Sequence, residues 1–168
     1  MMAGTESLFR QLVDCLNEQE EILERLIASG KRQFKALRIN DLEGLNKTVG
    51  EQQSDGLKME EAERRRLAVQ ALLEEELFIG RGASTLKGLV LFAPDSLKTA
   101  LQIKLGVLNN KLNELKEINS LNSRLIKNIL LLNERLLKLL APEGAATYDP
   151  KGGLEGKAKK LSVLNKSV

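Results

Sequence analysis

The 168-residue sequence contains no histidine and no tryptophan, and only one cysteine, one tyrosine and three prolines. Without histidine, the chain lacks the commonest general base and the imidazole ligand of most metal sites. The di-iron sites of helical bundles need Glu-x-x-His pairs, and a single cysteine cannot complete a zinc site. We therefore expect no enzyme activity, no bound metal and no cofactor.

An excess of charge of one sign is also missing. Lys and Arg number 26 against 23 Asp and Glu, and the two signs are interleaved. Such mixing is typical of solvated helix surfaces, whereas a nucleic-acid-binding protein usually carries a one-sided basic surface. We therefore expect no nucleic-acid partner.

Long apolar runs are absent as well. No stretch approaches the ~20 apolar residues that a membrane-spanning helix needs, and the first residues lack the pattern of a signal peptide. The single Cys15 excludes an internal disulfide and fits a reducing compartment. These absences predict a cytoplasmic protein with no stable membrane insertion.

What the sequence has in quantity is leucine at helical spacing. Hydrophobic residues make up 42% of the chain and aromatic residues only 3%, which favours helices over a sheet. The predicted fold is all-α: an elongated antiparallel three-helix bundle or long helical hairpin, with a disordered C-terminal tail. We expect a helical bundle over residues 1–141, with helices at about 6–38, 41–78, 84–92 and 96–140, and a flexible tail over 142–168.

Local signals suggest where these helices begin. Asn40 and Glu43 have the spacing of a capping box, and Ser84 can cap the short third helix. Gly50 and Gly56 weaken the second helix, and its continuity across them stays open.

The fourth helix carries the strongest pattern. Its first half keeps heptad spacing at Leu101, Leu105, Leu108, Leu112 and Leu115. Continuing that register places Asn119, Asn122 and Asn133 on the seam. A stammer-like shift after Leu115 instead restores an apolar seam. The shifted seam runs through Ile118, Leu121, Leu125, Ile129, Leu132, Leu136 and Leu139.

The end of this helix, over residues 126–140, is apolar on all sides. A helix of this kind must be covered on more than one face. Its neighbours in the bundle could cover it, or one face could be left for an amphipathic helix of a partner. The residues alone favour neither alternative.

Three segments, in this order and spacing, resemble one known family. They are Ala36-Leu37-Arg38-Ile39-Asn40-Asp41-Leu42-Glu43-Gly44-Leu45, Leu115-Lys116-Glu117-Ile118-Asn119-Ser120-Leu121-Asn122-Ser123-Arg124-Leu125-Ile126, and Thr147-Tyr148-Asp149-Pro150-Lys151-Gly152. The chain is similar to the FlgN family, the flagellar type III export chaperones for the hook–filament junction proteins.

The resemblance implies a function and two sites. A member of this family binds hook-associated proteins in the cytoplasm, shields the helical termini through which they polymerise, and delivers them to the flagellar export gate. The family's gate contact corresponds here to Tyr148. The family's cargo surface corresponds here to the apolar end of the fourth helix, and we expect cargo to bind Leu125, Ile129, Leu132, Leu136, Leu139 and Leu140. As such a chaperone, the chain would be a monomer or a weak homodimer.

Two other functions compete with this one. A structural coiled-coil adaptor would self-associate through the same leucine stripe. A peripheral membrane protein would use residues 127–140 as an amphipathic anchor.

Overall fold

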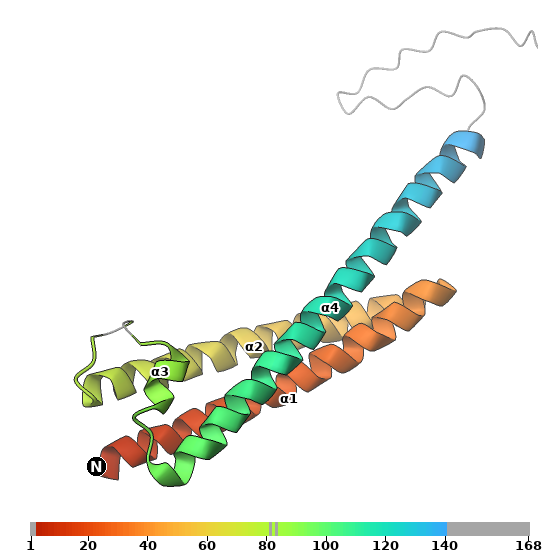
Figure 1. The fold of residues 1–168 in the computed structure, drawn as a ribbon. Coiled ribbons are helices and arrows are strands. Elements are labelled where there is room, and N and C mark those ends of the chain that lie inside the picture. Colours follow the sequence, from red (N-terminus) through yellow and green to blue (C-terminus); the bar gives the residue numbers. More distant parts are fainter. Residues whose placement is uncertain (1–2, 81, 83, 141–168) are drawn as a thin grey trace, which may run out of the picture. The chain divides into compact units, whose positions relative to one another are not determined.

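The computed structural model describes residues 3–80, 82 and 84–140, and the described residues form α-helices and no strand (Figure 1). The all-α fold class predicted from the sequence is therefore confirmed. The helices, in chain order, are α1 (Ala3–Ile39), α2 (Leu42–Glu76), α3 (Leu86–Val90) and α4 (Asp95–Leu140).

The chain divides into two compact units, Met1–Ile126 and Lys127–Val168. The helix α4 begins in the first unit and ends in the second. The tail expected over 142–168 lies outside the described residues, and its flexibility remains a prediction.

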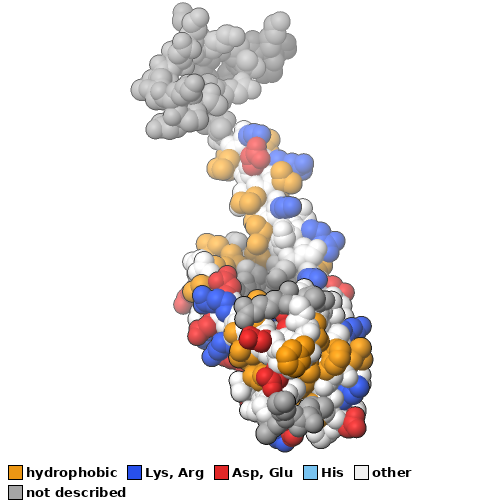
Figure 2. Space-filling model, turned by 90° about the vertical axis from the view of Figure 1, so that its left-hand side faces the viewer, with side chains coloured by type: hydrophobic (Ala, Val, Ile, Leu, Met, Phe, Trp, Pro, Cys, Tyr) orange, Lys and Arg blue, Asp and Glu red, His pale blue; other side chains and the backbone are white. Residues whose placement is uncertain are grey.

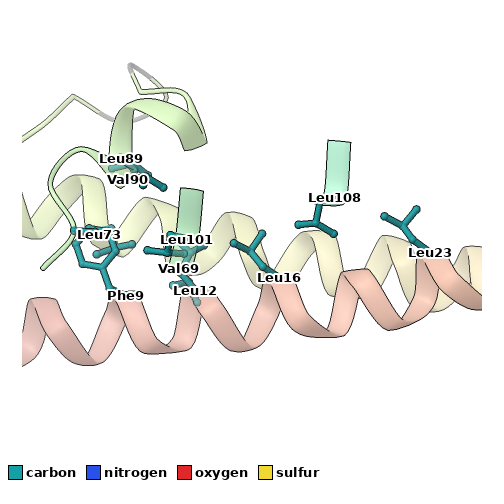
Figure 3. Close-up of a cluster of buried hydrophobic side chains, with 11 residues drawn as sticks. Phe9, Leu12, Leu16, Leu23, Val69, Leu73, Leu89, Val90, Leu101 and Leu108 are labelled. Atoms are coloured by element: carbon teal, nitrogen blue, oxygen red, sulfur yellow. The ribbon is translucent and has the colours of Figure 1, made fainter. Parts of the chain in front are cut away.

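In the first unit, α1 and α2 run antiparallel and side by side (Figure 1). The reason is the apolar stripe of α1, which recurs at steps of three, four and seven and can be buried only against another helix. Figure 3 shows side chains from all four helices pointing into one cluster. Its buried members are Phe9, Leu12, Leu16, Leu23, Val69, Leu73, Leu89, Val90, Ala93, Leu101 and Leu108.

The helix α2 is continuous across the two glycines that left its integrity open. Asp55, between them, is buried and forms an ion pair with Arg25 of α1, with 3.0 Å between Nε and Oδ1. Burial of Asp55 and its ion pair with the exposed Arg25 give the weak stretch a tertiary partner on α1, which explains why the glycines do not interrupt the helix.

The connection between α1 and α2 corrects the expected capping box. Asn40 has a φ of 55°, and the N–H of Asp41 donates to the carbonyl of Ala36 at 2.9 Å, the pattern of a Schellman motif that ends α1. Asp41, not Asn40, caps α2, because its Oδ1 accepts from the N–H of Gly44 at 3.0 Å.

The connection between α2 and α3 is organised by the buried carboxylate of Glu74. The Ser84 hydroxyl donates to it at 2.7 Å and the Gly82 N–H at 2.8 Å, and these bonds lower the pKa of the Glu74 carboxyl. Since Ser84 is used in this way, the prediction that it caps α3 is wrong. Thr85 caps α3, its Oγ1 accepting from the N–H of Gly88 at 3.1 Å.

The helix α4 contacts α1 through apolar and polar side chains. Lys111 pairs with Glu24 at 2.8 Å, between Nζ and Oε1. Further along, Asn122 is only 3% exposed and its Nδ2 donates to the Gly30 carbonyl at 3.0 Å and to Gln33 Oε1 at 2.8 Å.

This burial corrects one position of the expected seam. Ile118 and Leu125 are half-buried, as the stammer-like shift predicts, but Leu121 is exposed and Asn122 takes the inward position between them. The asparagine is tolerated there because α1 supplies two acceptors for its side-chain amide.

Candidate functional site

The candidate site lies at the end of α4, over residues 127–140, which belong to the second unit. The segment contains no glycine or proline, and Leu, Lys, Arg and Glu are strong helix formers, so the helix extends through all of it. Its apolar side chains are Ile129, Leu130, Leu131, Leu132, Leu136, Leu137, Leu139 and Leu140.

The residues expected to bind cargo are unequally exposed. Leu125, which belongs to the first unit, and Ile129 are half-buried. Beyond them the expected positions are exposed, and Leu132 reaches 57%. A helix turns by about 100° per residue, so spacings of three and four place the expected residues on one face. The exposed members of that face are Leu132, Leu136, Leu139 and Leu140.

Three leucines of this segment outside the expected set are also exposed, and Leu131 is one of them at 52%. Leu130 is 62% exposed and Leu137 is 69% exposed. They are seven residues apart and therefore share a stripe of their own beside the expected face. The sequence indicated them through the apolar character of this segment on all sides. They were not among the expected binding residues because they lie outside the one apolar seam predicted for α4.

The charged side chains of the segment are mostly basic. Lys127, Arg135 and Lys138 stand against Glu134. Glu134 accepts from Lys138 Nζ at 2.7 Å, and this hydrogen bond lowers the pKa of the Glu134 carboxyl. Both partners are exposed, so the pair contributes little stability.

Tyr148, the residue expected to contact the export gate, lies outside the described residues. Its proposed role therefore rests on the sequence.

The first unit has apolar surface that the sequence analysis did not single out. A groove of about 860 Å³ lies between α3 and α4, with Leu86, Val90 and Leu105 among its lining residues. Leu91 and Phe92, directly after α3, are exposed. Figure 2 faces the end of this unit where α3 lies and shows hydrophobic side chains gathered on it. The sequence could have indicated this surface, because Leu91 and Phe92 are large apolar residues in a connection just before Pro94.

Neither a cluster of metal ligands nor a membrane-spanning helix occurs in the described ranges 3–80, 82 and 84–140. Within them no three His, Cys, Asp or Glu side chains gather as metal ligands would. None of the helices described has the length and hydrophobicity needed to cross a membrane.

Comparison with known proteins identifies the family. The model of the family described as FlgN protein matches residues 1–156, which is nearly the whole chain. No curated protein and no solved structure matches the chain. The chain therefore belongs to the FlgN family, a family of flagellar export chaperones.

Proposed function

We propose that this chain is a cytoplasmic export chaperone that binds hook-associated proteins of the hook–filament junction and delivers them to the flagellar type III export gate. Membership of the FlgN family supports the general role. The observation that carries the specific proposal is the row of exposed leucines on one face of α4, which includes Leu132, Leu136 and Leu139. Contiguous exposed apolar surface of this kind marks protein interaction sites.

The proposed contact is a helix-on-helix interface. An amphipathic helix presents apolar side chains at i, i+3, i+4 and i+7, and the cargo face, Leu125, Ile129, Leu132, Leu136, Leu139 and Leu140, has the matching periodicity. Covering the terminal helix of a hook-associated protein in this way would prevent that helix from polymerising before export.

The size of the cargo face agrees with the energy that binding requires. Full burial of one leucine contributes about 1.5–3 kcal/mol, whereas association costs about 4–15 kcal/mol in lost freedom of motion. One or two leucines are therefore insufficient, and a stripe of several is needed for a stable complex.

Delivery to the gate is assigned to Tyr148. Tyrosine is enriched among the residues that dominate interface energies, since it combines a large apolar ring with a hydrogen-bonding hydroxyl. In this proposal Tyr148 contacts the export gate while the cargo face holds the cargo. The chaperone acts as a monomer or weak homodimer, and no metal, cofactor or catalytic step takes part.

The test is a pull-down of the hook-associated proteins of the same organism with the wild-type chain and two matched variants. Leu132→Asp places a charge on the cargo face, and Leu131→Asp places the same charge on the adjacent, mainly basic side of the helix. The two leucines are similarly exposed, at 57% and 52%, so the substitutions perturb the free protein equally. We expect Leu132→Asp to abolish binding and Leu131→Asp to weaken it far less. Capture of no hook-associated protein by folded wild-type chain would refute the proposal.

The competing function is a self-associating structural adaptor, which the same exposed leucines would also serve. Sedimentation equilibrium separates the two proposals. A stable oligomer whose mass does not change with concentration, and which does not dissociate when cargo is added, favours the adaptor. A monomer that forms a complex only with cargo favours the chaperone.

A further inference from the structure

The proposed cargo face does not account for all the apolar surface of residues 127–140. Its stripe contains Ile129, Leu132, Leu136 and Leu139. The exposed Leu130 and Leu137 form a second stripe, rotated from the first by roughly 100–140° at 3.6 residues per turn. Leu140 falls between the two and joins them.

Together the two stripes cover about half of the helix circumference. A helix that packs against one neighbour needs an apolar arc of about 100°, so this arc is wide enough for two neighbours. The second stripe is as exposed as the first: Leu130 and Leu137 are 62% and 69% exposed, and Leu132 is 57% exposed.

The remaining side of the segment carries the exposed Leu131 and is otherwise mainly basic. Lys127, Arg135 and Lys138 lie there with one carboxylate, Glu134. Glu134 pairs with Lys138. Among the described residues no carboxylate forms an ion pair with Lys127 or Arg135. Both side chains are exposed. In Figure 2, hydrophobic and basic side chains of this segment lie next to one another.

Building on the proposed function, we propose that residues 127–140 bind two amphipathic helices of one partner, arranged as a helical hairpin and carrying Asp and Glu beside their apolar stripes. One helix covers the stripe of Leu132 and Leu136, and the other covers the stripe of Leu130 and Leu137. The acidic residues at the edges of the two helices face Lys127, Arg135 and Lys138. Opposite charges at the rim of an apolar contact favour the correct partner and accelerate its binding.

Charge also argues against a second copy of the chain as the occupant. A copy would bring the same three cations and only Glu134 to offset them, so like charges would meet along the rim. An acidic hairpin meets no such repulsion.

The test uses synthetic helical hairpins and the full chain. One hairpin carries two leucine stripes flanked by Glu, and the matched hairpin carries Lys at the same positions. Isothermal titration calorimetry should show the Glu hairpin binding one to one, and the Lys hairpin binding at least roughly tenfold more weakly, since three attractive pairs become repulsive. A single helix cut from the Glu hairpin should bind twice per chain.

Two double variants test the two halves of the inference. Leu130→Gln with Leu137→Gln should weaken the Glu hairpin at least tenfold and remove one of the two sites for the single helix, because each lost leucine contact is worth roughly a factor of ten. Arg135→Glu with Lys138→Glu should reverse the preference between the Glu and Lys hairpins. Circular dichroism confirms that both variants keep the wild-type helix content.

Three results would overturn the inference: equal affinity for the two hairpins, no effect of the Leu130 and Leu137 substitutions, or tight binding to phosphatidylglycerol vesicles that the Glu hairpin does not displace. The last would make an anionic membrane the occupant. The results that would refute the proposed function differ from those that would refute the inference. If no hook-associated protein binds but the Glu hairpin does, that function fails and the inference stands. If hook-associated proteins bind and neither double variant weakens them, the inference alone fails.

Discussion

Replacing Gly30, inside α1, by alanine should not stabilise the protein, although this substitution usually stabilises a helix. Alanine is more favourable than glycine in a helix interior by about 1 kcal/mol. A Cβ at Gly30, however, would lie 2.8 Å from Cγ2 of Ile118 on α4. This methyl group is bonded directly to the branched Cβ of isoleucine, whose χ1 is stiff in a helix, so it cannot move aside alone.

The expected magnitude follows from these two opposing effects. An extra methyl group in a well-packed contact costs about 1–3 kcal/mol. Subtracting the helix-propensity gain leaves Gly30→Ala destabilised by about 0–2 kcal/mol. Gly50→Ala and Gly56→Ala are the matched controls, because a Cβ at either position of α2 has no neighbour within 4 Å. Both should be stabilised by about 0.5–1 kcal/mol.

The assay is urea unfolding followed by circular dichroism for the three variants and wild type. The deciding quantity is the difference between Gly30→Ala and the mean of the two controls, expected at about 1–3 kcal/mol. A second substitution, Ile118→Ala, removes the opposing methyl group, and in this background Gly30→Ala should become stabilising. If Gly30→Ala alone stabilises the protein as much as Gly50→Ala, then α1 and α4 do not approach this closely and the reasoning is wrong.

Three further predictions concern buried polar groups and the proposed sites. Asn122→Asp replaces an amide donor with a carboxylate that faces two acceptors, so it should cost at least about 2 kcal/mol at pH 7, and thermal melts should show part of this recovered in acid as the carboxylate protonates. Glu74 has a lowered folded-state pKa, so its contribution is present above the unfolded-state pKa of about 4.3 and is lost as the pH falls through the folded value. Glu74→Gln should therefore be less stable at neutral pH and lose less stability on acidification, which unfolding curves at several pH values would measure. Leu132→Asp or Leu136→Asp should abolish cargo binding in pull-downs, whereas Tyr148→Ala should retain cargo but impair swimming; loss of cargo by Tyr148→Ala would contradict this division of roles.

The helices could be predicted from the sequence, but their caps could not. Leucine periodicity alone indicates α1, α2 and α4, because an apolar stripe at steps of three and four admits few other structures. At both connections, however, two adjacent residues can act as caps. Tertiary contacts decide between them: Asn40 adopts a positive φ and leaves the cap to Asp41, and the buried Glu74 engages Ser84 and leaves the cap to Thr85.

The candidate site was predictable as a region but not residue by residue. The excess of leucine after residue 125 is visible in the sequence, yet exposure depends on which neighbours each helix face meets. Asn122 shows the difficulty, because its burial depends on a carbonyl of α1, 92 residues away in the chain. Leu121 shows the opposite case: it is an apolar residue at an expected seam position, yet it is exposed.

The exposed leucines of α4 are better explained by binding than by a contribution to the stability of the fold. Leaving a leucine in water forgoes about 1.5–3 kcal/mol that burial would provide. Selection for stability alone would place lysine or glutamate at Leu132 and Leu139, since these residues form helices equally well and keep the surface polar. Leu132→Lys should therefore leave the free energy of unfolding within about 0.5 kcal/mol of wild type. If the same variant keeps its stability but loses its cargo, the leucine is retained for binding and not for folding.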